Sequence, residues 1–308
     1  MSPGPDMPRF GRVVTAMVTP FDDAGALDVP AAQELARWLA AHGSDALVLS
    51  GSTGESSVLT DDEKVDLWRA VAEVVTIPVI AGSGSNDTAH SIAMTRAAAE
   101  CGVDGILAVT PYYNRPSQAG IYEHFRVVAE AAGDLPVLLY DIPIRSGRRI
   151  ETATMLRLAR EVPGIVGLKD AAGDPPSTAH LAAQAPAGFE IYSGDDNMTL
   201  PLLAVGAIGL VSVAAHWVGP QLRAVIDAFM AGDLAAAIAG NAELLDSFDF
   251  ESSAEFPNPL PAKAALRALG LRVGQCRLPM GPATAELDAQ AAKVVAAVGP
   301  PAVTASLG

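Results

Sequence analysis

The most reactive candidate residue in the sequence is Lys169, which lies within an apolar run, 165–171, typical of a buried strand. An apolar wall disfavours the charged ammonium, so the pKa of a lysine held there falls from about 10.4 toward neutrality. A partly neutral lysine can attack a carbonyl and form a Schiff base. On position alone, a strand-end lysine paired with Asp170 or a nearby carboxylate is an equally good interpretation. The other three lysines lie in stretches with helical spacing, from which we expect them to reach solvent: Lys64, Lys263 and Lys293.

Hydroxyl and phenol groups follow two other apolar runs. Ser52 and Thr53 stand between glycines in the segment GSTGES (51–56), where hydroxyls and free backbone N–H groups could hold a carboxylate. The alternative is an ordinary tight turn that caps the next helix. Tyr112 and Tyr113 follow another run, and only one of them can face a given pocket, because adjacent strand residues point to opposite sides. Packing of both rings is the alternative interpretation.

A tyrosine and an arginine occur close together, at Tyr140 and Arg145. The tyrosine could move protons, and the arginine could bind a carboxylate through two hydrogen bonds. An exposed loop arginine without a role is the alternative. Two acidic residues, Asp195 and Asp196, follow a later run, and we expect them to cap the next helix rather than to form an acid–base pair.

Metal and serine-hydrolase chemistry have little support in the sequence. The five histidines show no metal-ligand spacing, and no G-x-S-x-G segment occurs. We therefore expect no metal site. The remaining set of a lysine, tyrosines, paired hydroxyls and an arginine suits carbonyl chemistry on a keto acid.

Apolar runs alternate with amphipathic stretches of helical length, and this unit occurs eight times. The runs that predict strands are 13–20, 46–50, 78–81, 105–111, 136–143, 165–171, 190–193 and 208–213. The stretches that predict helices are 30–41, 61–75, 88–101, 118–131, 152–161, 178–185, 196–205 and 221–231. Several runs are apolar throughout, as parallel strands covered on both faces must be. The pattern predicts a closed (β/α)8 TIM barrel, in which the strand ends converge on one mouth.

A doubly wound open sheet is the alternative architecture. Such a sheet usually has a Gly-rich phosphate loop after its first strand, but TPFD (19–22) stands there. Beyond residue 231 the strand pattern stops, and helical spacing continues over 233–247, 259–269 and 282–298. We predict a barrel over residues 1–231 and a C-terminal helical extension over 232–308 that packs on it.

Composition limits the partners of this 308-residue chain. Hydrophobic residues are 50% and charged residues 18%, which favours a compact α/β protein. The net charge of −15 argues against nucleic acid or an anionic membrane surface. Residues 197–222 lack Asp, Glu, Lys and Arg over a length that fits a membrane span, but prolines and glycines interrupt them, so we expect buried core. Two isolated cysteines and no secretion signal indicate a reducing compartment.

Five motifs together resemble the pyruvate-dependent class I aldolase family (the N-acetylneuraminate lyase superfamily), and most closely its dihydrodipicolinate synthase branch. They are GSTGES (51–56), TPYYNRPSQ (110–118), YDIP (140–143), GLKD (167–170) and SGDD (193–196). The resemblance implies a Schiff base between Lys169 and pyruvate, with no metal or organic cofactor. The resulting enamine would attack L-aspartate 4-semialdehyde, and the adduct would cyclise to 4-hydroxy-tetrahydrodipicolinate in lysine and diaminopimelate biosynthesis.

The resemblance also implies roles for single residues. Thr53 and nearby backbone N–H groups would hold the pyruvate carboxylate, and Tyr140 would be the general acid and base. Ser52 and Tyr113 would complete a proton relay with Tyr140, and Tyr113 would come from a neighbouring subunit of a homotetramer. Arg145 would bind the carboxylate of the aldehyde substrate. Two further residues would line the pyruvate pocket: Gly194 and Val211.

The chain departs from the synthase pattern at a few positions. The pair Ser52-Thr53 replaces two threonines and is shared with sialic acid and keto-deoxy-sugar lyases, so a pyruvate aldolase acting on a sugar acid or another aldehyde stays open. Arg145 and the complete segment YYNRPSQ (112–118) favour the synthase. Asp141 replaces a common asparagine. A catalytically silent binding barrel is a third hypothesis, against which the intact lysine and tyrosines argue.

Relatives inhibited by lysine carry His and Glu residues in an interface pocket. This chain retains Ser56 and Asn86 there, but it has other residues at the matching positions: Asp61, Lys64 and His90. We expect weak or absent inhibition by lysine. We also expect a cytoplasmic enzyme that acts on small molecules.

Overall fold

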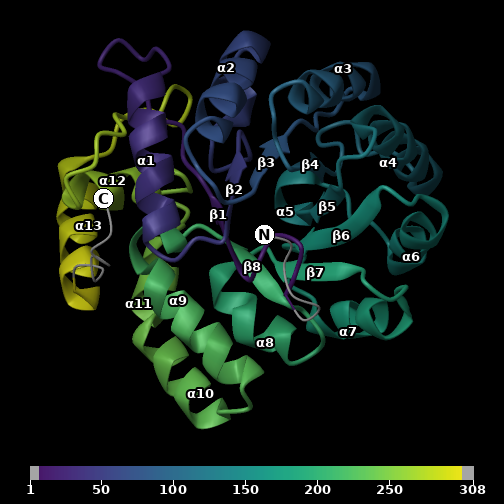
Figure 1. Ribbon diagram of the computed structural model, residues 1–308. Coiled ribbons are helices and arrows are strands. Elements are labelled where there is room, and N and C mark those ends of the chain that lie inside the picture. The colour runs from purple at the N-terminus through teal and green to yellow at the C-terminus, as the bar shows by residue number, and fades with distance from the viewer. Residues whose placement is uncertain (1–6, 300–308) are drawn as a thin grey trace.

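The chain forms a closed barrel of eight parallel strands surrounded by helices (Figure 1). The computed structural model describes residues 7–299. Neighbouring strands follow chain order and β8 pairs with β1, so the predicted (β/α)8 architecture is confirmed. The strands are β1 Val13–Ala16, β2 Ala46–Leu49, β3 Val79–Gly82, β4 Gly105–Val109, β5 Val137–Asp141, β6 Ile165–Asp170, β7 Glu190–Ser193 and β8 Gly209–Ser212.

Helices cover the outside of the barrel, and several begin at a side-chain cap that the sequence supplies. Thr60 and Glu63, for example, form a reciprocal capping box at the start of α2. The surrounding helices are α1 Val29–Ala41, α2 Asp61–Ala72, α3 Thr88–Ala99, α4 Gln118–Ala132, α6 Thr152–Glu161, α7 Pro175–Gln184, α8 Thr199–Leu203 and α9 Ala215–Met230. Short helical turns follow three strands: η1 Ser56–Val58, α5 Pro143–Ser146 and η2 Asp196–Met198.

The core has two layers because alternate strand residues point to opposite faces. One set fills the barrel interior and includes Val48, Ile80, Leu107 and Leu138. The other set packs between the strands and the helices. Both faces of the strands are therefore buried, which accounts for the continuous apolar runs in the sequence.

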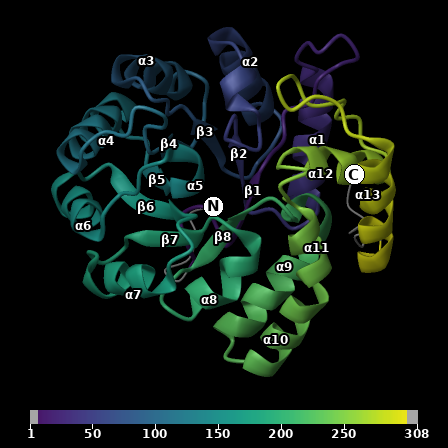
Figure 2. The same ribbon diagram turned by 180° about the vertical axis from the view of Figure 1, so that it is seen from behind.

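The C-terminal helices lie together at one side of the barrel, beside α1 and α9 (Figure 2). They are α10 Leu234–Glu243, α11 Leu245–Phe250, α12 Leu260–Ala268 and α13 Ala285–Val298. The predicted helical extension thus contains helices, and α12 packs on α9 and α13. The division of the chain into two parts at residue 231 stays a prediction. The ends of the two predicted parts, residues 1–6 and 300–308, lie outside the described residues.

Several helices differ from the sequence-based expectation, three of them in ways that change the local structure. Helix α9 begins at Ala215 rather than at 221, because a kink with non-helical Val218 accommodates Pro220 inside the helix. The expected helix 196–205 is divided into η2 and α8, and the expected helix 233–247 is interrupted at Leu244. Among residues 7–299, no helix has the length and apolarity needed to cross a membrane.

Candidate active site

Lys169 lies at the carboxyl end of β6, between Tyr140 of β5 and Tyr192 of β7 in the strand register. Its Nζ atom is 4.4 Å from the centroid of the Tyr140 ring, and the residue is 5% exposed. It forms no ion pair with any residue in the range 7–299. The neighbouring Asp170 instead accepts a 2.6 Å hydrogen bond from the Thr178 hydroxyl, so the alternative of a Lys169–Asp170 pair is wrong.

Burial lowers the pKa of Lys169 to about 8. The positive charge of Arg145 acts in the same direction, whereas three carboxylates oppose it: Asp195, Asp196 and Glu251. An appreciable fraction of the Lys169 amine is therefore neutral near pH 8. The neutral amine is the form that attacks a carbonyl carbon.

Lys263 corrects one expectation from the sequence, because it does not reach solvent. It is 0% exposed, and its Nζ atom lies 2.8 Å from Glu55 Oε1 and 3.0 Å from the carbonyl oxygen of Gln275. Its helical spacing is real, but that face of α12 packs against Phe21, Glu55 and the segment at Gln275. Burial alone therefore does not distinguish Lys169. What distinguishes Lys169 from Lys263 is that Lys169 lines a cavity and has no carboxylate as an ion-pair partner within residues 7–299.

Lys169 lines a cavity of about 420 Å³ at the carboxyl ends of the strands. Five other predicted site residues line the same cavity: Ser52, Thr53, Tyr140, Arg145 and Gly194. They follow β2, β5 and β7 or lie in β5, so residues distant in the sequence converge there. This convergence is what the barrel architecture requires of its strand ends.

Tyr140 is buried and lines the cavity beside Ser52, whose hydroxyl acts to lower the pKa of the phenol. Burial raises the pKa of the Tyr140 phenol, which therefore keeps its proton at neutral pH. Thr53 is 3% exposed, and its hydroxyl accepts a 3.0 Å hydrogen bond from Asn258 Nδ2. The hydroxyl pair thus has a defined position, with one side chain toward the phenol and the other held by the C-terminal segment.

Arg145 and Gly194 complete the part of the cavity predicted from the sequence. Arg145 belongs to the short helix α5, is exposed, and donates a 3.4 Å hydrogen bond from Nη2 to the carbonyl oxygen of Asn258. A Cβ atom on Gly194 would lie 2.7 Å from the Cβ of Ala171. The glycine therefore allows the two strand ends to approach one another closely.

Two predicted site residues lie elsewhere in the single chain. Val211 is buried in the barrel interior with Tyr140, while Val213 lines the cavity. Tyr113 is 90% exposed and has a left-handed backbone with φ of 71°. A contact of Val211 with pyruvate and a contribution of Tyr113 from a neighbouring subunit stay predictions.

Comparison with known proteins assigns the chain to a family. The model of the dihydrodipicolinate synthetase family matches residues 9–298. The chain belongs to this family. A 4-hydroxy-tetrahydrodipicolinate synthase of Symbiobacterium thermophilum is 51% identical over 295 residues, which cover 95% of this chain and 99% of that protein. A synthase of Moorella thermoacetica is 50% identical and covers 90% of this chain and 94% of its own length.

Solved structures of the dihydrodipicolinate synthetase family share the fold closely. The dihydrodipicolinate synthase DapA-2 of Bacillus anthracis has a TM-score of 0.90 at 44% identity, covering 94% of this chain and 99% of that chain. The enzyme of Cyanidioschyzon merolae, solved with lysine bound, has the same TM-score and identity and covers 94% and 98% of the two chains.

Sequence analysis missed several residues that line this cavity, and three of them carry polar side chains that matter for the site. Glu251 and Asn258 come from the connection between α11 and α12, and only the Pro-rich segment FPNPLP (256–261) could have marked it as more than a linker. The third, Asp195, was expected to cap a helix and instead lines the cavity. Asp196 likewise caps no helix, because its carboxylate accepts hydrogen bonds from the Ser212 hydroxyl and the Val213 amide.

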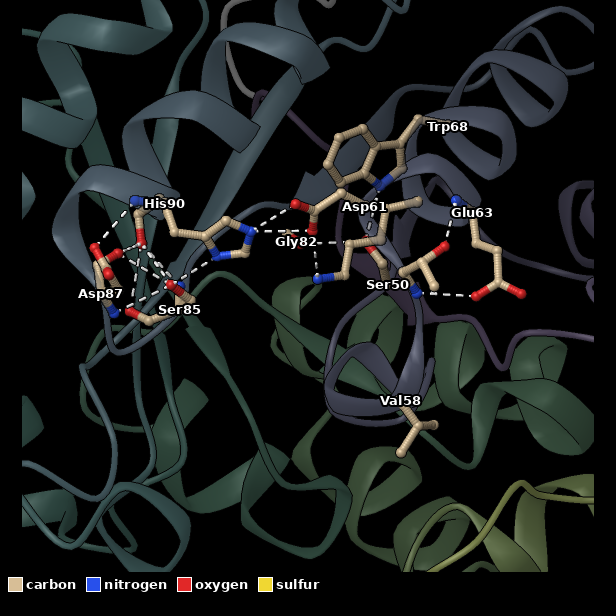
Figure 3. A network of polar contacts seen from close by, with 12 residues as sticks. Ser50, Val58, Asp61, Glu63, Trp68, Gly82, Ser85, Asp87 and His90 are labelled. Carbon is tan, nitrogen blue, oxygen red and sulfur yellow. Dashed lines mark hydrogen bonds and ion pairs between the residues drawn. The ribbon is translucent and has the colours of Figure 1, made fainter.

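Asp61, Lys64 and His90 stand where lysine-inhibited relatives are expected to carry other residues, and they contact one another between α2 and α3. Figure 3 shows Asp61, Ser85 and His90 pointing toward one another. His90 Nε2 lies 2.9 Å from Asp61 Oδ2, and His90 Nδ1 lies 3.2 Å from Ser85 Oγ. Lys64 Nζ is 3.9 Å from Asp61 Oδ1. These polar groups partner one another, which leaves the carboxylate of Asp61 engaged by two side chains.

Asp141 lies next to Tyr140 but faces away from the Lys169 cavity. It lines a small pocket with Asp170, its strand partner, and accepts a 3.1 Å hydrogen bond from the Ile150 amide. Burial raises the pKa of Asp141 to about 7, and the charge of Asp170 adds to this effect. Within residues 7–299, no group of three or more His, Cys, Asp or Glu side chains is arranged to hold a metal ion.

Proposed function

We propose that this chain condenses pyruvate with L-aspartate 4-semialdehyde to form 4-hydroxy-tetrahydrodipicolinate. The observation that carries the proposal is the Lys169 amine, which is buried in a cavity beside Tyr140, lacks an ion-pair partner and has a pKa of about 8. The relatives that are about half identical over nearly the whole chain carry the same activity in their names.

Pyruvate binds first in this account. The Thr53 hydroxyl and the backbone N–H groups of its loop hold the carboxylate, which places the ketone carbon near Lys169. The neutral amine adds to that carbon, and the carbonyl oxygen leaves as water after it accepts protons. The protonated Tyr140, which lines the cavity beside Ser52, is the group within reach that supplies and recovers protons.

The imine then makes the pyruvate methyl group acidic, because the positively charged nitrogen accepts the electron pair of the broken C–H bond. The resulting enamine carbon attacks the aldehyde carbon of the second substrate. Arg145, at the edge of the cavity, binds that substrate's carboxylate. The amino group of the adduct finally closes the ring at the former ketone carbon and releases the Lys169 amine.

Three further parts of the proposal concern what surrounds this chemistry. The imine itself serves as the electron acceptor, so we propose that no metal or organic cofactor takes part. We also propose a homotetramer, built as a dimer of dimers, in which the exposed Tyr113 of one subunit joins the proton relay of its neighbour. A biosynthetic role with free metabolites as substrates suits the cytoplasm.

Substrate competition tests the proposal. Purified protein is given pyruvate with either L-aspartate 4-semialdehyde or a sugar-derived aldehyde, and kcat/KM is compared for each aldehyde. We expect L-aspartate 4-semialdehyde to be preferred by several orders of magnitude. A preference for the sugar-derived aldehyde would instead assign the chain to the aldolases that act on sugar acids.

A further inference from the structure

The Lys169 cavity contains charged side chains of both signs, but the proposed reaction uses only the basic ones. Lys169 and Arg145 line it together with two acidic residues, Asp195 and Glu251. Pyruvate is an anion, and the second substrate also carries a carboxylate. Two carboxylates in the wall of a site for anions are unfavourable unless they bind something positive.

Glu251 is the acidic cavity residue that has a solvent-shielded, unsatisfied carboxyl oxygen. It follows α11, and its Oε2 atom is shielded from solvent without a hydrogen-bond partner among residues 7–299. Burial raises the pKa of Glu251 well above its usual value, and the charges of Asp196 and Asp195 add to the effect. By contrast, Asp196 is engaged by Ser212 and Val213. A shielded carboxyl oxygen without a partner is costly, and a ligand donor would relieve that cost.

The chemistry of the second substrate identifies that donor. L-Aspartate 4-semialdehyde has three polar groups: an aldehyde, a carboxylate and an ammonium. The aldehyde meets the enamine on Lys169 and the carboxylate meets Arg145, which leaves the ammonium without a partner. Glu251 lines the same cavity as Lys169, on whose carbon adduct the amino group must close the ring.

We propose that Glu251, assisted by Asp195, binds the ammonium group of the aldehyde substrate and thereby selects an amino-acid aldehyde over aldehydes without an amino group. The inference rests on the proposed function and names the specificity of that same site. Before the substrate arrives, the raised pKa of Glu251 weakens its repulsion of pyruvate. The incoming ammonium then stabilises the ionised carboxylate, so the acidic wall becomes favourable only when the correct substrate is present.

A pair of aldehydes that differ only in the amino group tests the assignment. Pyruvate consumption is followed with L-aspartate 4-semialdehyde and with succinic semialdehyde, for the wild type, Glu251→Gln and Glu251→Asp. The ratio of the two kcat/KM values should fall by about tenfold or more in Glu251→Gln, since a charge-assisted hydrogen bond is lost. Glu251→Asp should keep part of the preference. Glu255→Gln, at an exposed position of the same connection, is the matched control and should keep all of it.

A second measurement needs no variant, so a folding defect cannot obscure the result. L-Homoserine and 4-hydroxybutyrate differ by the same amino group, and L-homoserine should compete more strongly against L-aspartate 4-semialdehyde in the wild type. Equal inhibition by the two compounds contradicts the proposal. So does a Glu251→Gln variant that slows both aldehydes equally, because Glu251 would then act only through Lys169. When both aldehydes are slowed equally and pyruvate with borohydride still labels Lys169 in Glu251→Gln, the inference fails and the proposed function stands.

Discussion

Two buried lysines in one chain show what makes a lysine reactive. Lys263 is the more deeply buried, but Glu55 lies 2.8 Å away and compensates its charge. Lys169 has no such partner and lies in a cavity that a substrate can enter. Desolvation thus disfavours the charged form of Lys169 directly, and the lysine remains accessible to a small keto acid.

The pH dependence of imine formation follows from the lowered pKa of Lys169. Below about pH 8 the amine is mostly protonated and cannot attack, so kcat/KM for pyruvate should rise with pH and level off above about 8. The measurement is a rate profile between about pH 6 and pH 10 in buffers of constant ionic strength. A rise centred near the ordinary lysine pKa of about 10.4 would mean that Lys169 is not desolvated in solution.

Removal of the Tyr140 hydroxyl should slow proton transfer, while the remaining ring keeps the shape of the cavity. We expect Tyr140→Phe to lower kcat by about 10²–10⁴-fold, the usual contribution of a positioned acid or base. Tyr192→Phe is the matched control, because Tyr192 is the other strand partner of Lys169 and its hydroxyl bonds to Glu190 instead. Equal losses in both variants would indicate a packing effect rather than catalysis.

At the scale of elements, the sequence predicted the strands and the residues at their ends, because buried parallel strands have continuous apolar runs. Because these strand ends meet at one mouth of the barrel, the convergence of Thr53, Tyr140, Arg145 and Lys169 could be predicted without knowing any side-chain contact. The wall supplied by the connection between α11 and α12 could not be predicted. Its contact with Thr53 joins residues 205 positions apart and follows no local periodicity.

The buried pair of Lys263 and Glu55 connects α12 to the loop that contains Thr53. Lys263→Met should leave the Glu55 carboxylate buried and unpaired, which lowers the free energy of unfolding by about 3–5 kcal/mol. Because the pair anchors that loop, KM for pyruvate should also rise. Chemical denaturation and steady-state kinetics measure the two effects.

Two comparisons make this prediction specific. Adding Glu55→Gln should recover part of the lost stability, since the unpaired charge is removed. Lys293→Met, on the exposed face of α13, should change the free energy of unfolding by less than about 0.5 kcal/mol. An unchanged KM in a folded Lys263→Met protein would show that the pair does not position the loop.

At the scale of the whole molecule, the proposed homotetramer can be tested through the exposed Tyr113. Tyr113 is 90% exposed, an unusual state for a large aromatic side chain, and it lies outside the Lys169 cavity. If a partner subunit supplies Tyr113 reciprocally, Lys169→Ala and Tyr113→Phe subunits refolded together should regain about a quarter of wild-type activity. Random pairing makes half of the dimers mixed, and each mixed dimer has one intact site of two. Activity no greater than the mean of the two separate variants would show that a partner subunit does not supply Tyr113.

Inhibition by lysine should be weak in this chain. Asp61 and His90 form a 2.9 Å contact with each other, and the ammonium of Lys64 adds a positive charge that opposes a second ammonium. Steady-state kinetics with increasing L-lysine measures this, with L-arginine as a control for ionic strength. An inhibition constant in the sub-millimolar range would contradict the expectation.

Trapping of the imine tests the central claim most directly. The protein is incubated with pyruvate, reduced with borohydride, digested, and mapped by mass spectrometry, with Lys169→Ala as the control. We expect one pyruvate-derived adduct on Lys169 and none on Lys263, whose amine is buried against Glu55. An unlabelled Lys169, or labelling of another lysine to the same extent in the Lys169→Ala variant, would contradict the assignment of the reactive amine.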